Sequence, residues 1–288
     1  MPTVVDLHAH STASDGKRTP TGLVELAAER HVDVLALTDH DTLRGVEEAQ
    51  AAGRRLGVAV LPGIEISGRW SDGQCHLLAY LPDPVPSAFV EWTHAKERDR
   101  EERAREMVER LRAGGSAITW DDVRGRAAGN IGRPHVADAL VARGEAASRK
   151  AAFATLIGNG CPAYVPSGKV PPEEAIALAA AAGALVSLAH PYTLNLDGDD
   201  LERAVAGFRE AGLGAIEAHR GDQAPDVQAA YRDLARRLDL LVTVGSDYHE
   251  DEREAERRLG WGGAPGIAED DVAALLSRLP GAPGAPAG

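Results

Sequence analysis

The strongest constraint on the fold is a regular alternation of short apolar runs with amphipathic helical patterns. The apolar runs are rich in Val, Leu and Ile and lie at about 3–8, 33–38, 58–66, 75–81, 184–190, 213–219 and 240–246. The helical patterns between them lie near 20–30, 44–56, 172–182, 199–211 and 225–238. Strands that are apolar on both faces and alternate with helices predict an α/β fold, built on a mainly parallel sheet or barrel.

The alternation is interrupted between about 90 and 168. A long charged helix ends at Gly114-Gly115, and three shorter helical patterns follow at 119–127, 133–144 and 147–158. Charges of both signs are interleaved along the long helix, which favours a solvated face with i,i+4 pairs over a nucleic-acid surface. We therefore expect a barrel of residues 1–90 and 169–278, a helical insertion at 91–168 that caps the substrate site, and a flexible tail at 279–288.

The charge balance limits the partners that the chain can bind. It has 31 Lys and Arg residues against 44 Asp and Glu residues, a net charge of −13. Long duplex nucleic acid is not expected, because following its phosphates needs clustered basic residues. No apolar stretch approaches the ~18 residues of a membrane span, and the N-terminus lacks a signal-peptide pattern. We expect a cytoplasmic protein that binds no membrane, with Cys75 and Cys161 reduced, and the sequence does not indicate its oligomeric state.

Histidines gather at the ends of the predicted strands. Seven of the ten histidines are placed there: His8, His10, His40, His76, His190, His219 and His249. The carboxyl ends of parallel barrel strands meet at one rim, where active sites form. The turn in GRWSDGQ makes the fourth strand return along the third, so His76 reaches the rim that Glu65 occupies. His8 and His10 are two residues apart on an extended segment and leave it on one face.

Three carboxylates join these histidines at the predicted rim, from Asp15, Glu65 and Asp247. Neutral imidazoles with carboxylates are typical ligands of Zn, Mn or Fe, and the set is too large for one ion. We predict two or three divalent ions, held by His8, His10, Asp15, His40, Glu65, His76, His190, Asp247 and His249. Two ions bridged by a carboxylate, for which Glu65 is the candidate, favour in-line displacement at phosphorus.

Several short motifs follow one another in a fixed order along nearly the whole chain. They are Asp6-Leu7-His8-Ala9-His10, Ser14-Asp15-Gly16, Thr38-Asp39-His40-Asp41, Gly63-Ile64-Glu65-Ile66, His76, Ala189-His190-Pro191 and Gly245-Ser246-Asp247-Tyr248-His249. This ordered set resembles the PHP (polymerase and histidinol phosphatase) family of metal-dependent phosphoesterases. The resemblance implies a distorted (β/α)7 barrel of the TIM type and up to three ions.

The resemblance also implies a role for each ligand. One ion would be held by His8, His10, Glu65 and Asp247, a second by Glu65, His76 and His190, and a third by Asp15, His40 and His249. A metal-bridging hydroxide would attack phosphorus in line, without a covalent intermediate. We expect Glu65 and Asp247 to be essential for this catalysis, with His249 and His219 as candidate acids for the leaving group.

The insertion carries a motif, Gly132-Arg133-Pro134-His135, that is similar to one branch of the family. That branch acts on nucleoside 3',5'-bisphosphates, nucleoside monophosphates and short RNA ends. Pro134 can open a helix whose free amides meet an anion, and Arg133 offers a fork for phosphate oxygens. We expect Arg133 and His135 to bind a small phosphorylated substrate. The alternative is an ordinary helix start with His135 facing the core.

One segment departs from this branch. In Glu217-Ala218-His219-Arg220-Gly221-Asp222, the aromatic residue and the later histidine that commonly follow the glutamate are missing. His219 and Arg220 are therefore expected either to bind a second phosphate or the leaving group, or to brace the rim. Asp6 and Asp39 are expected to orient ligand imidazoles, and Asp41 and Thr42 to cap a helix.

Two other functions stay open at this point. An amidohydrolase is also a metal barrel that begins with a His-x-His strand, but it commonly bridges its metals with a carbamylated lysine at a strand end. No lysine of this chain lies at a predicted strand end; they are Lys17, Lys96, Lys150 and Lys169. The other alternative is a non-catalytic metal-binding module, as in some polymerase-associated PHP domains.

Overall fold

The computed structural model describes residues 3–70, 74–166, 168–250, 258–260 and 269–282. Its strands are β1 (Val5–Ala9), β2 (Val34–Leu37), β3 (Ala59–Gly68), β4 (Cys75–Tyr80), β5 (Leu185–Leu188), β6 (Ala215–His219) and β7 (Leu241–Val244). They form one sheet in the order of the sequence, from β1 to β7. All seven predicted strands are thus confirmed.

The sheet curls into a nearly closed barrel. Pairing is parallel from β1 to β3 and from β5 to β7, whereas β4 is antiparallel to both of its neighbours. The predicted return of β4 is confirmed, because Ser67 lies opposite His76 in the β3–β4 register. Beyond β7, the amide of Asp247 donates to the carbonyl of His8 (2.7 Å), and the amide of His10 donates to the carbonyl of Tyr248 (2.9 Å).

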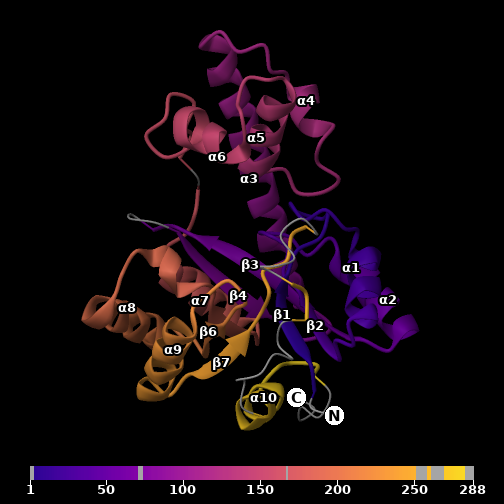
Figure 1. Ribbon diagram of the computed structural model, residues 1–288, viewed down its shortest axis with the longest axis vertical. Coiled ribbons are helices and arrows are strands. Elements are labelled where there is room, and N and C mark those ends of the chain that lie inside the picture. Colours follow the sequence, from indigo (N-terminus) through magenta and orange to yellow (C-terminus); the bar gives the residue numbers. More distant parts are fainter. Residues whose placement is uncertain (1–2, 71–73, 167, 251–257, 261–268, 283–288) are drawn as a thin grey trace.

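Helices cover the outside of the barrel (Figure 1). They are α1 (Pro20–Glu29), α2 (Val46–Leu56), α7 (Pro172–Ala181), α8 (Gly198–Glu210), α9 (Pro225–Arg237) and α10 (Glu269–Leu276). Helices α1 and α2 bury apolar side chains against β1 and β2, and α7, α8 and α9 do so against β3 to β6. Helix α10, which the sequence pattern did not predict, packs Leu275 into a cluster with Val5 and Leu7 of β1.

The predicted helix at 44–56 begins later than expected. Gly45 occupies the N-cap of α2, so the expected capping by Asp41 and Thr42 is wrong. The Asp41 carboxylate instead accepts a hydrogen bond from the amide of Ser67 (2.9 Å). The Thr42 hydroxyl donates to the buried carboxylate of Glu97. Both residues therefore stabilise the loop that follows β2 rather than the helix.

The insertion is a helical unit with its own apolar core. It comprises α3 (Ser87–Ala113), α4 (Trp120–Arg124), α5 (Arg133–Ala142), α6 (Arg149–Ala152) and the π-helical turn η1 (Phe153–Ile157). Side chains from all five elements pack together, including Val108, Val123, Leu140, Ala152 and Ile157. Helix α3 begins at the barrel, and the other helices of the insertion pack along it above one end of the barrel (Figure 1).

Three smaller expectations concern the tail, the cysteines and membranes. Residues 283–288 of the expected tail lie outside the described residues, whereas Leu279 and Ala282 are buried beside α10. Cys75 and Cys161 are both free thiols, and burial raises the pKa of Cys75 to about 12. Among the helices that the structure describes, none combines the length and apolarity needed to cross a membrane. The cytoplasmic location stays a prediction.

Candidate metal centre and its cationic pocket

All nine predicted ligands meet at one end of the barrel, in what we call the metal cluster. Their ligand atoms form four overlapping groups, each within 4.8 Å: His10, Asp15, His40 and His249; His8, His10 and Glu65; His8, His190 and Asp247; His40, Glu65 and His76. Side chains that are up to 241 residues apart in the sequence, such as His8 and His249, are thus brought together by the closure of the barrel. Because the groups share residues but do not all converge on one point, they fit several neighbouring ions better than a single ion.

Glu65 lies at the centre of the cluster. Its Oε2 atom is 3.4 Å from His8 Nε2, 3.2 Å from His10 Nε2 and 3.1 Å from His40 Nδ1. Its Oε1 atom is 2.8 Å from His76 Nδ1 and 2.9 Å from His190 Nε2. The two oxygens thus face different sets of imidazoles, which is the arrangement that a carboxylate bridging two ions requires.

Asp247 joins the cluster from the loop after β7. Its Oδ1 atom lies 3.4 Å from His8 Nε2, 3.3 Å from His10 Nε2 and 3.4 Å from His249 Nδ1. Asp247 has a positive φ of 52°, a backbone conformation that residues other than glycine rarely adopt. On the other side of His249, its Nε2 atom lies 3.5 Å from Asp15 Oδ1.

The residues present fit divalent cations. Among the described residues, buried ring nitrogens of His8, His10, His40 and His76 and the Oε2 atom of Glu65 have no hydrogen-bond partner. Even at 2.8 Å, His76 Nδ1 and Glu65 Oε1 do not make a hydrogen bond. Buried polar atoms are rarely left without partners, so atoms that converge in this way fit the ligand set of a cation.

The electrostatics of the cluster agree with this interpretation. Burial opposes ionisation of Glu65, but the imidazoles of His40, His76 and His8 outweigh it and hold the pKa of Glu65 well below its usual range. Burial likewise opposes charge on His10, yet the carboxylates of Asp247 and Glu65 raise its pKa to about 10. Burial lowers the pKa of His40 to about 3. The carboxylates are thus ionised and stabilise positive charge on His10, whereas His40 is neutral at neutral pH.

Glu217 supports the cluster from behind, and the sequence analysis did not assign it a role. It is fully buried in β6, and its Oε1 atom lies 2.9 Å from His8 Nδ1. Its Oε2 atom accepts a hydrogen bond from the amide of His190 (2.8 Å). A Cβ atom at Gly245, directly after β7, would lie 2.3 Å from His8 Cβ and 2.9 Å from the backbone nitrogen of His8, so a glycine is needed where the chain passes this pair. A carboxylate on the far nitrogen fixes a ligand imidazole, so Glu217 would orient His8 if its Nε2 atom holds a metal ion.

The two aspartates expected to orient imidazoles contact other groups. Asp6 accepts hydrogen bonds from the amides of Ser246 (3.0 Å) and Gly260 (2.7 Å), and Asp39 accepts them from Ser11 and Ser14. These bonds hold the loops that carry the ligands. That expectation is therefore wrong in its detail: Glu217, rather than Asp6 or Asp39, contacts a cluster imidazole from behind.

Arg220 lies beside the metal cluster, whereas the contacts of His219 lead away from it. The guanidinium of Arg220 is fully buried, 3.2 Å from Asp247 Oδ2 and 3.6 Å from Glu217 Oε2, and it makes two hydrogen bonds with Asp222. This geometry favours bracing of the rim over phosphate binding. The buried Nδ1 atom of His219 lies 3.2 Å from the side chain of Gln228 in α9.

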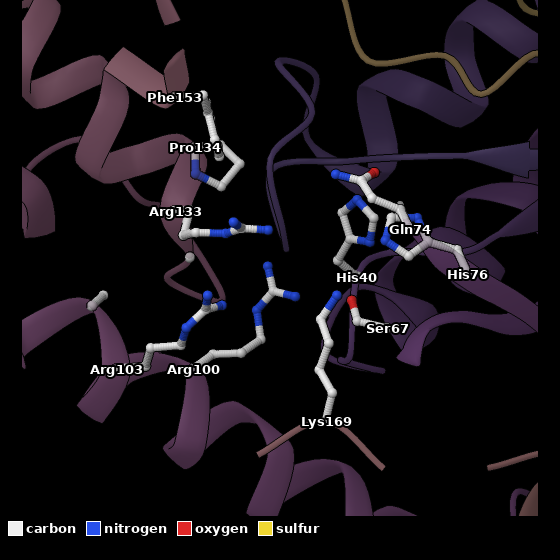
Figure 2. A pocket seen from close by; sticks show the side chains of 12 residues that line it. His40, Ser67, Gln74, His76, Arg100, Arg103, Arg133, Pro134, Phe153 and Lys169 are labelled. Atoms are coloured by element: carbon white, nitrogen blue, oxygen red, sulfur yellow. The ribbon is translucent and has the colours of Figure 1, made fainter. Parts of the chain in front are cut away.

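A cavity of about 200 Å³ opens beside the metal cluster, and its lining is strongly basic (Figure 2). Arg100 and Arg103 of α3, Arg133 of α5 and Lys169 direct their cationic groups into it, opposite His40 and His76. We call this cavity the cationic pocket. The i,i+4 pairs Arg105–Glu101 and Arg110–Glu106 are confirmed on α3, but the solvated-face interpretation missed the two arginines that face the pocket.

The cations of this pocket are close enough to perturb one another. Burial, together with the charges of Arg133, Arg100 and Arg103, lowers the pKa of Lys169 to about 8, although Asp41 opposes the shift. Asp41 forms an ion pair with Arg100 at 2.5 Å. Crowded cations with few carboxylates form a site for an anion.

Arg133 and His135 occupy different positions at the start of α5. Arg133 is the first helical residue and lines the cationic pocket. His135 is buried, and its Nδ1 atom accepts a hydrogen bond from the amide of Gly132 (3.1 Å). The structure thus gives His135 a capping position that agrees with the core-facing alternative, while Arg133 is placed as expected for a phosphate ligand.

Comparison with known proteins agrees with the fold. Residues 6–156 match the PHP domain. The chain is 33% identical to a 5'-3' exoribonuclease of Haemophilus influenzae, over 85% of this chain and 89% of that protein. It is 34% identical to a 3',5'-nucleoside bisphosphate phosphatase of Chromobacterium violaceum, over 85% and 87%.

A solved structure gives the same result. A candidate metal-dependent phosphoesterase of Bifidobacterium adolescentis superposes with a TM-score of 0.81 at 33% identity, covering 96% of this chain and 98% of that one. The predicted barrel and the predicted phosphoesterase class are confirmed, and the amidohydrolase alternative is not favoured. This chain therefore belongs to the PHP family of metal-dependent phosphoesterases.

Proposed function

We propose that this enzyme hydrolyses a small, nucleotide-like phosphate ester that carries a second anionic group. The carrying observation is that the cationic pocket adjoins the metal cluster and shares His40 and His76 with it. A phosphate at the cluster would leave a neighbouring phosphate of the same molecule within reach of Arg133 and Lys169. Nucleoside 3',5'-bisphosphates and 5'-phosphorylated ends of short RNA have this arrangement of charge. One relative is named a 3',5'-nucleoside bisphosphate phosphatase and another a 5'-3' exoribonuclease.

We further propose that the nine residues of the metal cluster hold two or three ions of Mn, Fe or Zn. When bound, such ions supply Lewis acidity and an activated water for attack on phosphorus. Glu65 would hold two ions at a fixed separation through its two oxygens. Asp247 would offer Oδ1 to the ions, while Arg220 occupies its Oδ2 atom and fixes its orientation.

The cationic pocket and the metal cluster would have different roles in the reaction. The cationic side chains of Arg100, Arg103 and Arg133 would stabilise the non-reacting phosphate and orient the substrate. Of the two histidines proposed as acid for the leaving group, His249 contacts Asp15 and Asp247 within the cluster, whereas His219 contacts Gln228. Because an imidazole that holds a metal ion is a poor proton donor, we assign His249 to the metal cluster and not to the leaving group.

A screen that measures both released phosphate and the nucleotide products of diester cleavage tests this function. Metal-free enzyme would be supplied separately with Mn, Zn or Fe and assayed on nucleoside monophosphates, 3',5'-bisphosphates, cyclic phosphates and short 5'-phosphorylated oligoribonucleotides. We expect substrates with a second phosphate to have the highest kcat/KM. Bound metal without turnover of any ester would instead support the non-catalytic module, and turnover that ignores the second phosphate would contradict the role of the cationic pocket.

A further inference from the structure

Tyr192 stands out because it is a large hydrophobic side chain with 44% of its surface exposed. It follows the candidate ligand His190 in a one-turn 3-10 helix, η2 (Pro191–Leu194). Isolated exposed apolar residues are ordinary on a protein surface. Tyr192, however, lines a cavity together with Glu65, His190 and Asp247, so its exposed ring lies at the metal cluster. We call this space the rim cavity.

The turn that carries Tyr192 is firmly held. The amide of Gln74 donates to the carbonyl of Thr193 (2.7 Å), and the Thr193 hydroxyl donates to the carbonyl of Gln74 (2.9 Å). The indole nitrogen of Trp70 donates to the carbonyl of Leu194 (3.0 Å). An exposed aromatic ring on a fixed backbone turn loses little conformational freedom when a ligand packs on it, which favours binding.

The surroundings of the ring are aromatic and cationic. The Arg220 guanidinium lies 5.7 Å from the centre of the Tyr192 ring, and the His190 ring lies 6.1 Å away in an edge-on arrangement. Because Arg220 is itself fixed by Asp247 and Asp222, the ring is supported by a chain of contacts that begins at the metal cluster.

The rim cavity and the cationic pocket both adjoin the metal cluster, but different kinds of side chain line them. Both are lined by His40, Gln74 and His76. Arginine and lysine side chains line the cationic pocket, whereas the rim cavity has Tyr192 and no lysine or arginine in its described lining. A substrate with its reacting phosphate at the cluster can thus place a second phosphate in one direction and a planar, uncharged group in the other.

We infer that Tyr192 is a stacking platform for the nucleobase of the substrate. This inference rests on the proposed function, because it assumes a nucleotide-like ester at the metal cluster. A nucleobase has a π face that every base shares, so stacking would give affinity with little sequence preference. The base could belong to a free nucleotide or to the terminal residues of a short RNA, since the recognised chemistry is the same.

The test compares Tyr192→Ala and Tyr192→Phe in the Mn-loaded full-length enzyme. The substrates are adenosine 3',5'-bisphosphate, the same sugar bisphosphate without a base, and a 5'-phosphorylated trinucleotide with or without its terminal base. We expect Tyr192→Ala to raise KM for the base-bearing forms by about 5- to 100-fold, at little change in kcat. The abasic forms should change less than twofold, and Tyr192→Phe should resemble the wild type.

Several outcomes would overturn the inference. Equal losses on substrates with and without a base would indicate a general disturbance of the site, which the metal content of each variant would also report. A loss in Tyr192→Phe as large as in Tyr192→Ala would assign the effect to the hydroxyl. If the wild type hydrolyses both bisphosphates with the same KM, stacking is refuted while the proposed function stands; if it hydrolyses neither substrate, both fail. An effect seen only with the bisphosphate, or only with the trinucleotide, would support stacking and show whether the base belongs to a free nucleotide or to an RNA end.

Discussion

Replacing Glu217 by Gln tests how the barrel holds its metal ligands. The Glu217 carboxylate contacts two donors from inside β6, His8 Nδ1 at 2.9 Å and the amide of His190 at 2.8 Å. A glutamine amide has one acceptor and one donor group. Whichever way it is turned, its NH2 group faces an N–H donor, and the negative charge that polarises His8 is lost. Outer-shell losses of this kind cost about 10- to 100-fold in metal affinity, which is about 1.4–2.7 kcal/mol.

The assay is competition for Mn²⁺ or Zn²⁺ between the metal-free protein and a chelating dye. Glu202→Gln provides a matched control, because Glu202 is a surface partner of Arg237 and lies outside the metal cluster. Circular dichroism of both variants checks that the barrel is intact. The reasoning is refuted if Glu217→Gln binds metal within about twofold of the wild type while remaining folded.

Three further predictions concern cations around the site. Arg133→Ala should raise KM for a nucleoside bisphosphate about tenfold or more, but change KM for a monophosphate little, since a charge-assisted hydrogen bond contributes about 1.5–3 kcal/mol; steady-state kinetics on both substrates measure this. Lys169 is charged below about pH 8 and neutral above it, so KM for the bisphosphate should rise above that pH. In Lys169→Arg the rise should be absent between pH 7 and 9, and its persistence there would disprove the assignment. Arg220→Met should lower the free energy of unfolding by about 3–5 kcal/mol in urea denaturation, because it leaves Asp247 and its neighbours without their buried partner.

The metal cluster could be predicted because its signal is local. Each ligand follows or ends an apolar strand, and parallel strands must bring their carboxyl ends to one rim. The exception, His76, could be placed because the turn before β4 reverses the chain. Glu217 was missed although a lone carboxylate in an otherwise apolar strand, LGAIEAH, is itself a signal of a buried charged role.

The cationic pocket could not be predicted in the same way. Arg100 and Arg103 belong to a 27-residue helix that is charged on all sides, so the sequence does not tell which face is covered. That face is set by packing between α3, α5 and the segment that returns to the barrel. Arg220 shows the same limit, because only the closure of the barrel places it against Asp247.

Metal-dependent phosphate release from adenosine 3',5'-bisphosphate is the decisive measurement for a catalytic metal cluster. Metal-free wild-type enzyme would be titrated with Mn²⁺ while bound metal and released phosphate are measured in the same samples. We expect turnover to rise with occupancy and to saturate at two or three ions per chain, and Glu65→Ala to lose both bound metal and turnover. Equal turnover in the metal-free enzyme, or in fully metal-supplemented Glu65→Ala, would contradict this expectation.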